Sequence, residues 1–379
     1  MNPSFTDSSN LSPYGWTPAL DDVFADHRRA GLVPARIMRV HRGSCDAITE
    51  HGPVRASVPV PQAADPLAAP CTGDWAALRP GREPELAAVL PRHSAIVRSS
   101  ASRTSHGQVL AANIDTVVIA VSLTAPLNAA RLERFIALAW SSGAQPLIVL
   151  TKADLAADAA HTAAAHTAAA HTAAAHTDVD ATHAEVGALA PGVGIVATSA
   201  ATGHNIDVLT ALLGDGTTVL LGPSGAGKST LGNALLGAEL LGTGTVREQD
   251  GKGRHTTVRR ELVRLPGGGV LIDTPGLRAI SLHDAADSLE QVFAEIEQLA
   301  EGCRFGDCAH DTEPGCAVQA AIQAGDLAGR RLDSYRKLQR ESAWQASRTD
   351  ARLRDERVNR QKSITSHLRA TYRFRDRQL

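Results

Sequence analysis

A glycine-rich stretch, GPSGAGKST at residues 222–230, ends in a lysine followed by two hydroxyl side chains. It fits the pattern G-x-x-x-x-G-K-[ST] through Gly222, Gly227, Lys228 and Ser229. Glycines let a backbone fold around phosphate oxygens, and a helix start presents free N–H groups to an anion. The alternative, a glycine-rich turn that binds nothing, does not need the lysine and the serine together. The predicted nucleotide-binding residues here are Gly222, Pro223, Ser224, Gly225, Ala226, Gly227, Lys228, Ser229 and Thr230.

Within this loop, Lys228 is expected to reach the β- and γ-phosphates, and the Ser229 hydroxyl is expected to take one Mg²⁺ position. A second Mg²⁺ contact is predicted from Asp273, which ends the apolar run GVLID at 269–273. The N–H of Gly276, three residues later, is positioned to face the γ-phosphate. Between the two segments lies GKGRHTT at 251–257, which predicts a mobile switch loop with Thr256 or Thr257 as a further Mg²⁺ ligand.

Two upstream stretches indicate which base is bound. PLIVLTKADL at 146–155 and GVGIVATSA at 192–200 are apolar runs that end in polar residues. A carboxylate at Asp154 can accept from the ring N1–H and the exocyclic amine of guanine together, whereas adenine would leave it unpaired. A Lys-Ala-Asp turn by itself is more commonly solvated, but beside a phosphate loop and TSA it favours guanine. The predicted base-side residues are Thr151, Lys152, Asp154, Ser199 and Ala200.

The residue after DTPG is Leu277, and a leucine cannot orient the attacking water of a hydrolysis reaction. His255 in the switch loop is the predicted catalytic residue, because an imidazole can hydrogen-bond a water and align it with the γ-phosphate. The alternative is that His255 only contacts phosphate or a partner.

Three of the five cysteines cluster with a histidine as C-x4-C-x-H-x5-C. Three thiolates and one imidazole suit a closed tetrahedral Zn²⁺ site, with no open position for a catalytic water. The predicted zinc ligands are Cys303, Cys308, His310 and Cys316. Cys45 and Cys71 are expected to be reduced thiols.

The elements that must position these residues can be placed coarsely. TTVLL at 217–221 predicts a buried strand and TLGNALLG at 230–237 a helix, which is the setting a phosphate loop requires. Residues 31–100 contain five short strand candidates, ARIMRV, DAITE, VRASVPV, DWAAL and AIVR, which predict a small barrel; a purely structural β module is the alternative. The repeat HTAAAHTAAAHTAAAHT at 161–177 predicts an alanine-rich insert. Its histidines would advance by about 140° per step around a helix and so share no face.

The order TKAD, TSA, GPSGAGKST, GRHTT and DTPG resembles that of the circularly permuted GTPases, and in particular the ribosome small subunit-dependent GTPase A family. PARIMRV, PRHSAIVR, AANIDTVVIAV and CRFGDCAHDTEPGCAV are similar to family segments, so the resemblance covers about residues 31–379. It implies an oligonucleotide-binding-type barrel, and it implies that the cysteine cluster binds zinc. One departure is Thr151, where the family has Asn; guanine selectivity is expected to persist through Asp154.

The resulting fold expectation is a multidomain α/β protein. A variable, poorly ordered extension is predicted at 1–30, an OB-like β-barrel at 31–100 and a circularly permuted P-loop GTPase domain at 101–295 with a low-complexity insert at 158–182. A zinc-binding, basic helical module is predicted at 296–379. The chain has a net charge of −2, but its charges are unevenly distributed: residues 330–379 hold fifteen Lys/Arg and only six Asp/Glu. This basic tail indicates either a solvated helix or a polyanionic partner.

The chain has no apolar run long enough to span a bilayer and no signal peptide at its start, so a cytoplasmic protein is expected. A monomer is expected as well. The functional expectation is a GTPase that uses Mg²⁺ and one Zn²⁺, binds the 30S subunit and 16S rRNA, and assists late maturation of the small subunit. Two alternatives are a P-loop hydrolase unrelated to ribosomes and a nucleic-acid-binding zinc protein with a passive nucleotide-sensing site.

Overall fold

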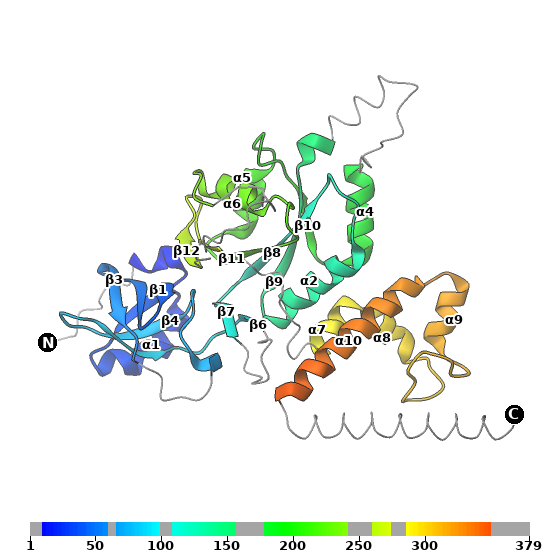
Figure 1. Ribbon diagram of the computed structural model, residues 1–379, viewed down its shortest axis with the longest axis horizontal. Coiled ribbons are helices and arrows are strands. Elements are labelled where there is room, and N and C mark those ends of the chain that lie inside the picture. The colour runs from blue at the N-terminus through cyan, green and yellow to red at the C-terminus, as the bar shows by residue number, and fades with distance from the viewer. Residues whose placement is uncertain are drawn as a thin grey trace, which may run out of the picture. The chain divides into compact units, whose positions relative to one another are not determined.

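The computed structural model describes residues 10–59, 66–98, 108–156, 178–241, 260–273 and 286–349. The chain divides into two compact units, one from Met1–Arg98 and Gln108–Ile280 and the other from Ser99–Gly107 and Ser281–Leu379. In the described residues, the first unit holds a barrel and an α/β sheet and the second holds helices (Figure 1). The second unit starts before the predicted boundary at 296, because α7 (Ala286–Val292) already belongs to it.

A closed five-stranded barrel forms the start of the first unit, in the order β1-β2-β3-β5-β4. Its strands are β1 (Val33–His41), β2 (Ser44–Thr49), β3 (Gly52–Ser57), β4 (Trp75–Arg79) and β5 (Glu85–Val89). Alternate residues of each strand point inward and are small or branched, which lets so few strands close around a filled interior. The interior residues are Ala35, Ile37, Cys45, Ala47, Ala56, Ala76, Leu78 and Leu86.

The prediction that AIVR forms the fifth strand of the barrel is wrong. Ala95–Arg98 is β6, which pairs with β7 (Gln108–Ala112) in a separate two-stranded sheet. The barrel is closed instead by β5, whose sequence Glu-Leu-Ala-Ala-Val favours a helix by propensity. Pairing with β4 and with the end of β3 overrides that preference, as tertiary context commonly does for short strands.

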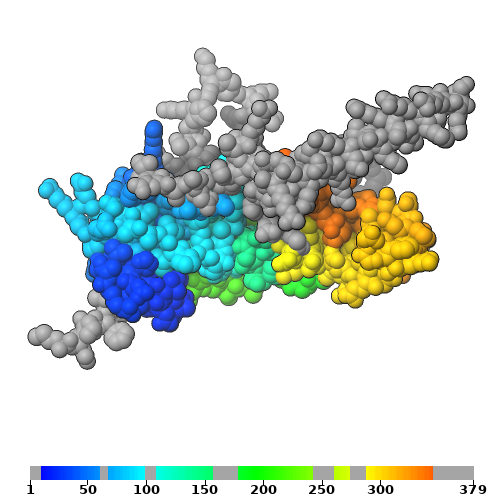
Figure 2. All heavy atoms as spheres, turned by 90° about the horizontal axis from the view of Figure 1, so that it is seen from below, coloured from blue at the N-terminus to red at the C-terminus, as the bar shows by residue number. Residues whose placement is uncertain are grey.

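Much of the segment expected to be a poorly ordered extension is folded onto the barrel, so that expectation is wrong for residues 10–30. A 3₁₀ turn, η2 (Ser12–Tyr14), precedes α1 (Pro18–Arg29), which Thr17 caps by accepting from the Leu20 N–H at 3.4 Å. Trp16 contacts Trp75 and Phe24 edge-on, with ring centroids 4.9 and 5.8 Å apart. Figure 2 shows the N-terminal residues, in dark blue, against the lighter blue and cyan barrel. Aromatic burial fixes this segment although aromatics are scarce in the chain.

A six-stranded sheet follows, in the order β10-β9-β8-β11-β13-β12. Its strands are β8 (Thr116–Ser122), β9 (Gln145–Thr151), β10 (Gly194–Ala197), β11 (Thr217–Leu221), β12 (Glu261–Arg264) and β13 (Val270–Asp273). All neighbours are parallel except β12 with β13. The carboxyl ends of the five parallel strands therefore meet at one edge, where α/β proteins bind their ligands.

Four described helices accompany this sheet: α2 (Ala129–Ser141), α4 (Val179–Leu189), α5 (Ile206–Leu213) and α6 (Lys228–Leu236). Helix α2 contacts β8, β9 and α4, while α6 contacts α5 and β11. The core between helices and strands is aliphatic and includes Val118, Val149, Leu209, Leu231 and Leu271. Because α4 starts at Val179, the end of the predicted insert at 158–182 belongs to this helix; residues 157–177 lie outside the described part.

A buried arginine joins the barrel to the sheet. Arg36 of β1 is 1% exposed and lies over the Trp75 ring at 4.7 Å. Its guanidinium donates to the Thr217 hydroxyl at 2.8 Å, to the Asn113 carbonyl at 3.1 Å and to the Tyr14 carbonyl. Thr217 is the first residue of β11, so the strand that leads into the phosphate loop is anchored from the barrel.

The second unit contains α7, α8 (Ala294–Ala300), α9 (Ala317–Ala324) and α10 (Gly329–Thr349). Arg331 of α10 binds the Glu295 carboxylate at 2.5 Å, donates to the Val292 carbonyl at 2.9 Å and lies over the Phe293 ring. The Tyr335 hydroxyl also donates to Glu297. These contacts hold α10 against α7 and α8. Among the described residues, none of the helices combines the length and the apolar character needed to cross a bilayer.

Candidate nucleotide and metal sites

The glycine-rich loop connects β11, which ends at Leu221, to α6, which begins at Lys228. Gly222, Gly225 and Gly227 have φ values of 145°, 77° and 82°, in the region that favours glycine. A Cβ on Gly222 would lie 2.7 Å from the Ala120 carbonyl oxygen of β8. The loop thus needs its glycines both for its backbone path and for its close approach to the neighbouring strand.

Lys228 folds back over this loop. Its Nζ donates to the Gly222 carbonyl at 2.9 Å and to the Pro223 carbonyl at 2.7 Å. The ammonium group therefore lies within the loop curve, where the N–H groups at the start of α6 also converge. An incoming phosphate would meet a positive charge already in place.

The base-side residues gather at the ends of β9 and β10. Thr151 ends β9 and is 4% exposed, and its hydroxyl contacts the Ala226 carbonyl of the phosphate loop at 2.8 Å. The Ala153 N–H donates to the Thr198 carbonyl at 3.1 Å, which ties the TKAD segment to the TSA segment. Thr151 therefore links the segment predicted to bind the base to the loop predicted to bind the phosphates.

Further contacts fix the individual base-side residues. Lys152 has φ of 63° and its Nζ lies 3.4 Å from the Thr124 hydroxyl. Asp154 follows in the first turn of the next helix. Ser199 is buried, and its hydroxyl accepts from the Thr202 N–H at 3.2 Å, while Ala200 begins the turn that follows. All five predicted base-side residues lie at the same sheet edge as the phosphate loop.

A cavity of about 220 Å³ opens beside the loop. It is lined by Ser224, Gly225 and Ala226 of the loop, by Lys152, and by the segment that joins β8 to α2. Its lining also includes four polar residues that were not predicted: Ser122, Thr124, Asn128 and Arg131. The signal that could have found two of them is position, since Ser122 is the last residue of a buried parallel strand and Thr124 follows it.

Asp273 ends β13, the strand next to the loop strand. Burial raises the pKa of its carboxyl, and the negative charge of Glu261 on β12 raises it further. Glu261 is itself paired with Arg39 of the barrel. A divalent cation would reverse this penalty, because a bound positive charge favours the carboxylate form.

Several predicted site residues lie outside the described part of the chain. These are the catalytic candidate His255, the Mg²⁺ candidates Thr256 and Thr257, and Gly276, together with Leu277. Their roles remain predictions.

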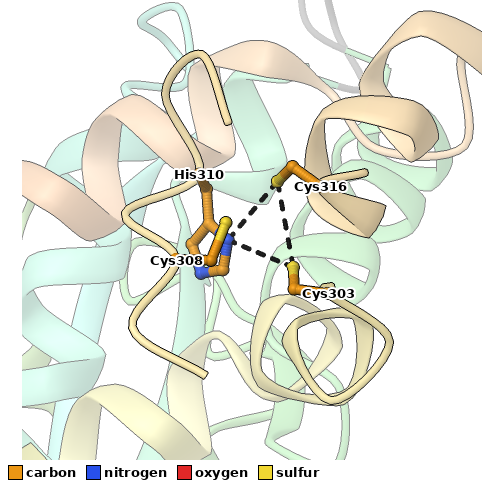
Figure 3. Close-up of side chains that lie close together, drawn as sticks. All are labelled: Cys303, Cys308, His310 and Cys316. Atoms are coloured by element: carbon orange, nitrogen blue, oxygen red, sulfur yellow. Dashed lines mark hydrogen bonds between the residues drawn. The ribbon is translucent and has the colours of Figure 1, made fainter. Parts of the chain in front are cut away.

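The four predicted metal ligands converge in the second unit (Figure 3). Cys303 Sγ and Cys316 Sγ are 3.8 Å apart, and each lies 3.6 Å from His310 Nδ1. All four ligand atoms, including Cys308 Sγ, lie within 4.8 Å of one another. Tetrahedral ligands at about 2.3 Å for sulfur and about 2.0–2.1 Å for nitrogen would be separated by about 3.8 Å for S···S and about 3.6 Å for S···N. The cluster therefore has the dimensions of a closed four-ligand metal centre.

The chain around the cluster is braced by its own polar groups. The Glu313 carboxylate accepts from the Ala309 N–H at 3.1 Å and from the Asp311 N–H at 2.7 Å. His310 has φ of 59°, and its carbonyl accepts from Arg336 of α10 at 2.6 Å. Cys316 Sγ accepts from the Gln319 N–H at 3.4 Å and so caps α9. Such outer contacts orient metal ligands.

The strand order, the glycine loop after β11 and the base-side segments that precede it in the chain define a P-loop nucleotide-binding domain with permuted connectivity. Comparison with known proteins agrees. The family model described as RsgA GTPase matches residues 89–283. The chain belongs to this RsgA GTPase family and is a GTPase.

Relatives match along most of their length. A protein of Streptomyces coelicolor named small ribosomal subunit biogenesis GTPase RsgA is 52% identical over 93% of this chain and 92% of its own. One of Lactiplantibacillus plantarum named small ribosomal subunit biogenesis GTPase RsgA 2 is 41% identical over 89% of this chain and 90% of its own.

Solved structures share the fold. YjeQ from Thermotoga maritima aligns with a TM-score of 0.55 at 23% identity, over 81% of this chain and 97% of its own. YloQ, described as a circularly permuted GTPase, aligns with a TM-score of 0.54 at 22% identity, over 81% of this chain and 93% of its own. The permuted architecture is therefore that of a known fold.

Proposed function

We propose that this GTPase acts on the small ribosomal subunit, binds 16S rRNA, and couples GTP hydrolysis to release from the maturing particle. One observation supports the GTP site most directly. The Thr151 hydroxyl, in the segment proposed to bind guanine, donates to the Ala226 carbonyl of the phosphate loop. The names of relatives that match almost the whole chain supply the partner.

In the nucleotide site, Lys228 and the loop N–H groups bind the phosphates. Ser229 and Asp273 hold Mg²⁺, which neutralises charge on the phosphates when bound, and Thr256 or Thr257 is proposed as a further ligand. Asp154 reads the guanine edge, while Lys152 and Ala200 are proposed to contact the base. Ser199 and Thr151 brace these segments.

The metal of the cysteine cluster is proposed to be zinc. Three thiolates and one imidazole are ligands that Zn²⁺ prefers, and the S···S and S···N separations suit its tetrahedral geometry. Four protein ligands leave no open position, so the ion would be structural. Cys303, Cys308, His310 and Cys316 would hold it.

Hydrolysis is proposed to depend on His255, because the residue after DTPG is Leu277 and cannot orient water. Without a partner to position His255, intrinsic turnover is expected to be slow. A large partner that fixes His255 beside the attacking water would accelerate the reaction by preorganisation.

The proposed RNA contacts are the barrel and the basic residues 330–379, since a positive segment on an otherwise acidic chain favours a polyanion. With the small subunit as partner, the proposed location is the cytoplasm. A monomeric state stays a prediction.

The test is GTP turnover with and without purified 30S subunits, with Lys228→Ala as a control that lacks the phosphate-binding ammonium. Strong stimulation of the wild type is expected. His255→Ala should retain GTP affinity but lose about 10²-fold of the stimulated rate. Equal turnover with and without subunits would favour a hydrolase unrelated to ribosomes, and equal RNA binding with GTP and GDP would favour a passive sensor.

The base assignment has its own test. Asp154→Asn replaces one acceptor with a donor, so preference should move from GTP towards XTP. Binding of labelled GTP and XTP measures this change. An unaltered preference for GTP would remove Asp154 from the site.

A further inference from the structure

A second cavity, of about 420 Å³, lies in the first unit away from the phosphate loop. Its walls are the end of β1, the chain before β4, the start of β7 and the residue before β12. None of its lining residues lines the cavity beside the loop. The barrel and the segments around the sheet build it together.

The lining is strongly basic. It includes Arg39, His41, Arg42 and Arg260, with Thr72 and Gln108 as neutral polar residues. None of the residues that line the cavity in the described part of the chain is acidic. Such a concentration of one charge sign in a recess focuses positive potential on whatever enters.

Two of the lining arginines have a donor atom without an acceptor, whereas His41 Nε2 lies 2.7 Å from Asp46 Oδ2 and is already paired. The Nε atoms of Arg39 and Arg260 are buried and have no hydrogen-bond partner, although Arg39 is paired through Nη2 with Glu261. Arg42 is exposed, and the described residues offer it no ion pair. A buried N–H without an acceptor is disfavoured and is normally satisfied in native structures.

A neighbouring arginine, by contrast, has its acceptors in place. Arg92 binds both oxygens of Asp74, at 2.6 and 2.7 Å. By contrast, burial lowers the pKa of Arg260, and the neighbouring positive charge of Arg98 lowers it further, against an opposing effect of Cys71. Burial is thus the main factor that disfavours the charge of Arg260, and an anion bound beside the guanidinium would favour it.

We propose that this cavity, lined by Arg39, His41, Arg42 and Arg260, is a binding site for a phosphate group. A phosphate offers several oxygens to charged donors, and three arginines line this one cavity. The volume exceeds that of a bare phosphate, so a sugar or a further phosphate can accompany it. The site is argued from the cavity alone and does not depend on the proposed ribosomal role.

The phosphate can come from an RNA strand or from a free anion or nucleotide. Protein saturated with Mg²⁺ and GDP, which blocks the phosphate loop, would be titrated calorimetrically with inorganic phosphate, and a short single-stranded RNA would then be added as competitor. Displacement of phosphate by the RNA assigns a strand. Binding of phosphate that RNA does not displace assigns a free anion. Either result supports the site.

Arg42→Gln and Arg260→Gln should each weaken phosphate binding about tenfold or more, the loss of one charge-assisted hydrogen bond. The matched control is Arg82→Gln, an exposed arginine of the same barrel that does not line the cavity, and it should bind as wild type does. Arg260→Lys keeps the charge and should retain much of the affinity, which keeps the test valid if Arg260→Gln does not fold. Absence of phosphate binding to wild type, or equal losses in Arg82→Gln and Arg42→Gln, would overturn the proposal.

Discussion

The phosphate loop and the cysteine cluster are both compact binding sites, but they are held in different ways. The loop connects a central strand to a helix, and its groups contact one another directly. Lys228 donates to two loop carbonyls, and Thr151 donates to the Ala226 carbonyl. The cluster collects four ligands from fourteen residues with no strand among them. Its ligand atoms face one another, which is a repulsive arrangement for thiolates unless a cation lies between them.

The two sites therefore differ in how much of their organisation comes from the fold and how much comes from the ligand. Strand pairing, aliphatic packing and the Arg36 anchor organise the nucleotide site before any ligand binds. In the metal site, ligand binding and local folding are expected to be the same event, as for small zinc-dependent modules. Four substitutions test this difference between the two sites.

The largest effect is expected from Cys308→Ser. Structural zinc sites contribute about 10 kcal/mol or more of apparent binding free energy, so losing a thiolate should release the ion and loosen α9. Metal per chain by mass spectrometry and hydrogen exchange of α9 measure both outcomes. Asp307→Ser, at the exposed neighbouring position, is the control and should keep the metal. A Cys308→Ser protein with normal exchange in α9 would mean that the fold alone holds the cluster.

Arg36→Met should have the next largest effect. It strips the donor from the Thr217 hydroxyl and from the Asn113 and Tyr14 carbonyls in a buried setting. We expect a loss of about 3 kcal/mol in the free energy of unfolding of the first unit. Denaturant titration measures this loss. Arg55→Met, which removes an exposed barrel pair with Asp46, is the control and should cost much less. Similar losses in both variants would refute the anchoring role.

Lys228→Ala should weaken GTP binding about 100-fold, because a charge-assisted contact to phosphate is lost. The thermal stability of the nucleotide-free protein should change little, since strands and helices hold the loop. Fluorescent-nucleotide titration and a melting curve test the two parts separately. A large loss of stability in the nucleotide-free protein would show that Lys228 holds the loop, and not the strands and helices around it.

Asp273→Asn should give the smallest and most diagnostic change. The folded protein binds a proton at Asp273 more readily than the unfolded chain does, because its pKa is raised. Above the ordinary aspartate range the ionised carboxyl therefore lowers stability, and that loss disappears as pH falls below the ordinary value of 3.8.

The Asp273→Asn variant should accordingly be slightly more stable than wild type at pH 7 without nucleotide and equal to it in acid. Its Mg²⁺-dependent GTP binding should fall about tenfold, because a charged ligand is lost. Melting curves against pH and titrations with and without Mg²⁺ measure both. Reduced stability at pH 7 would show that the carboxylate is a structural group instead.

Local patterns in the sequence predict much of this molecule. The strand before Gly222, the helix after Lys228 and the cysteine–histidine spacing all follow from side-chain period and ligand chemistry, and the structure places these residues together. A motif of this kind carries its own geometry, because its residues are close in the chain. That is why these two sites could be located without knowing how the strands pair.

What the sequence could not provide is pairing between distant segments. Glu85–Val89 forms a barrel strand because it pairs with β4 and β3, and no local pattern in the sequence indicates this pairing. The N-terminal helix is held by Phe24 against Trp16, which in turn packs on Trp75, 59 positions further along the chain. The Arg36–Thr217 bond joins residues 181 positions apart, so only the folded chain reveals it.

We propose that the nucleotide site lies within the first unit and that the unit holding the cysteine cluster contacts the ribosomal particle. GTP turnover by Cys308→Ser protein, with and without purified 30S subunits, tests this most directly. We expect an intrinsic rate equal to that of wild type and a loss of stimulation by the subunits. Full stimulation of the metal-free variant, or an intrinsic rate as low as that of Lys228→Ala, would contradict it.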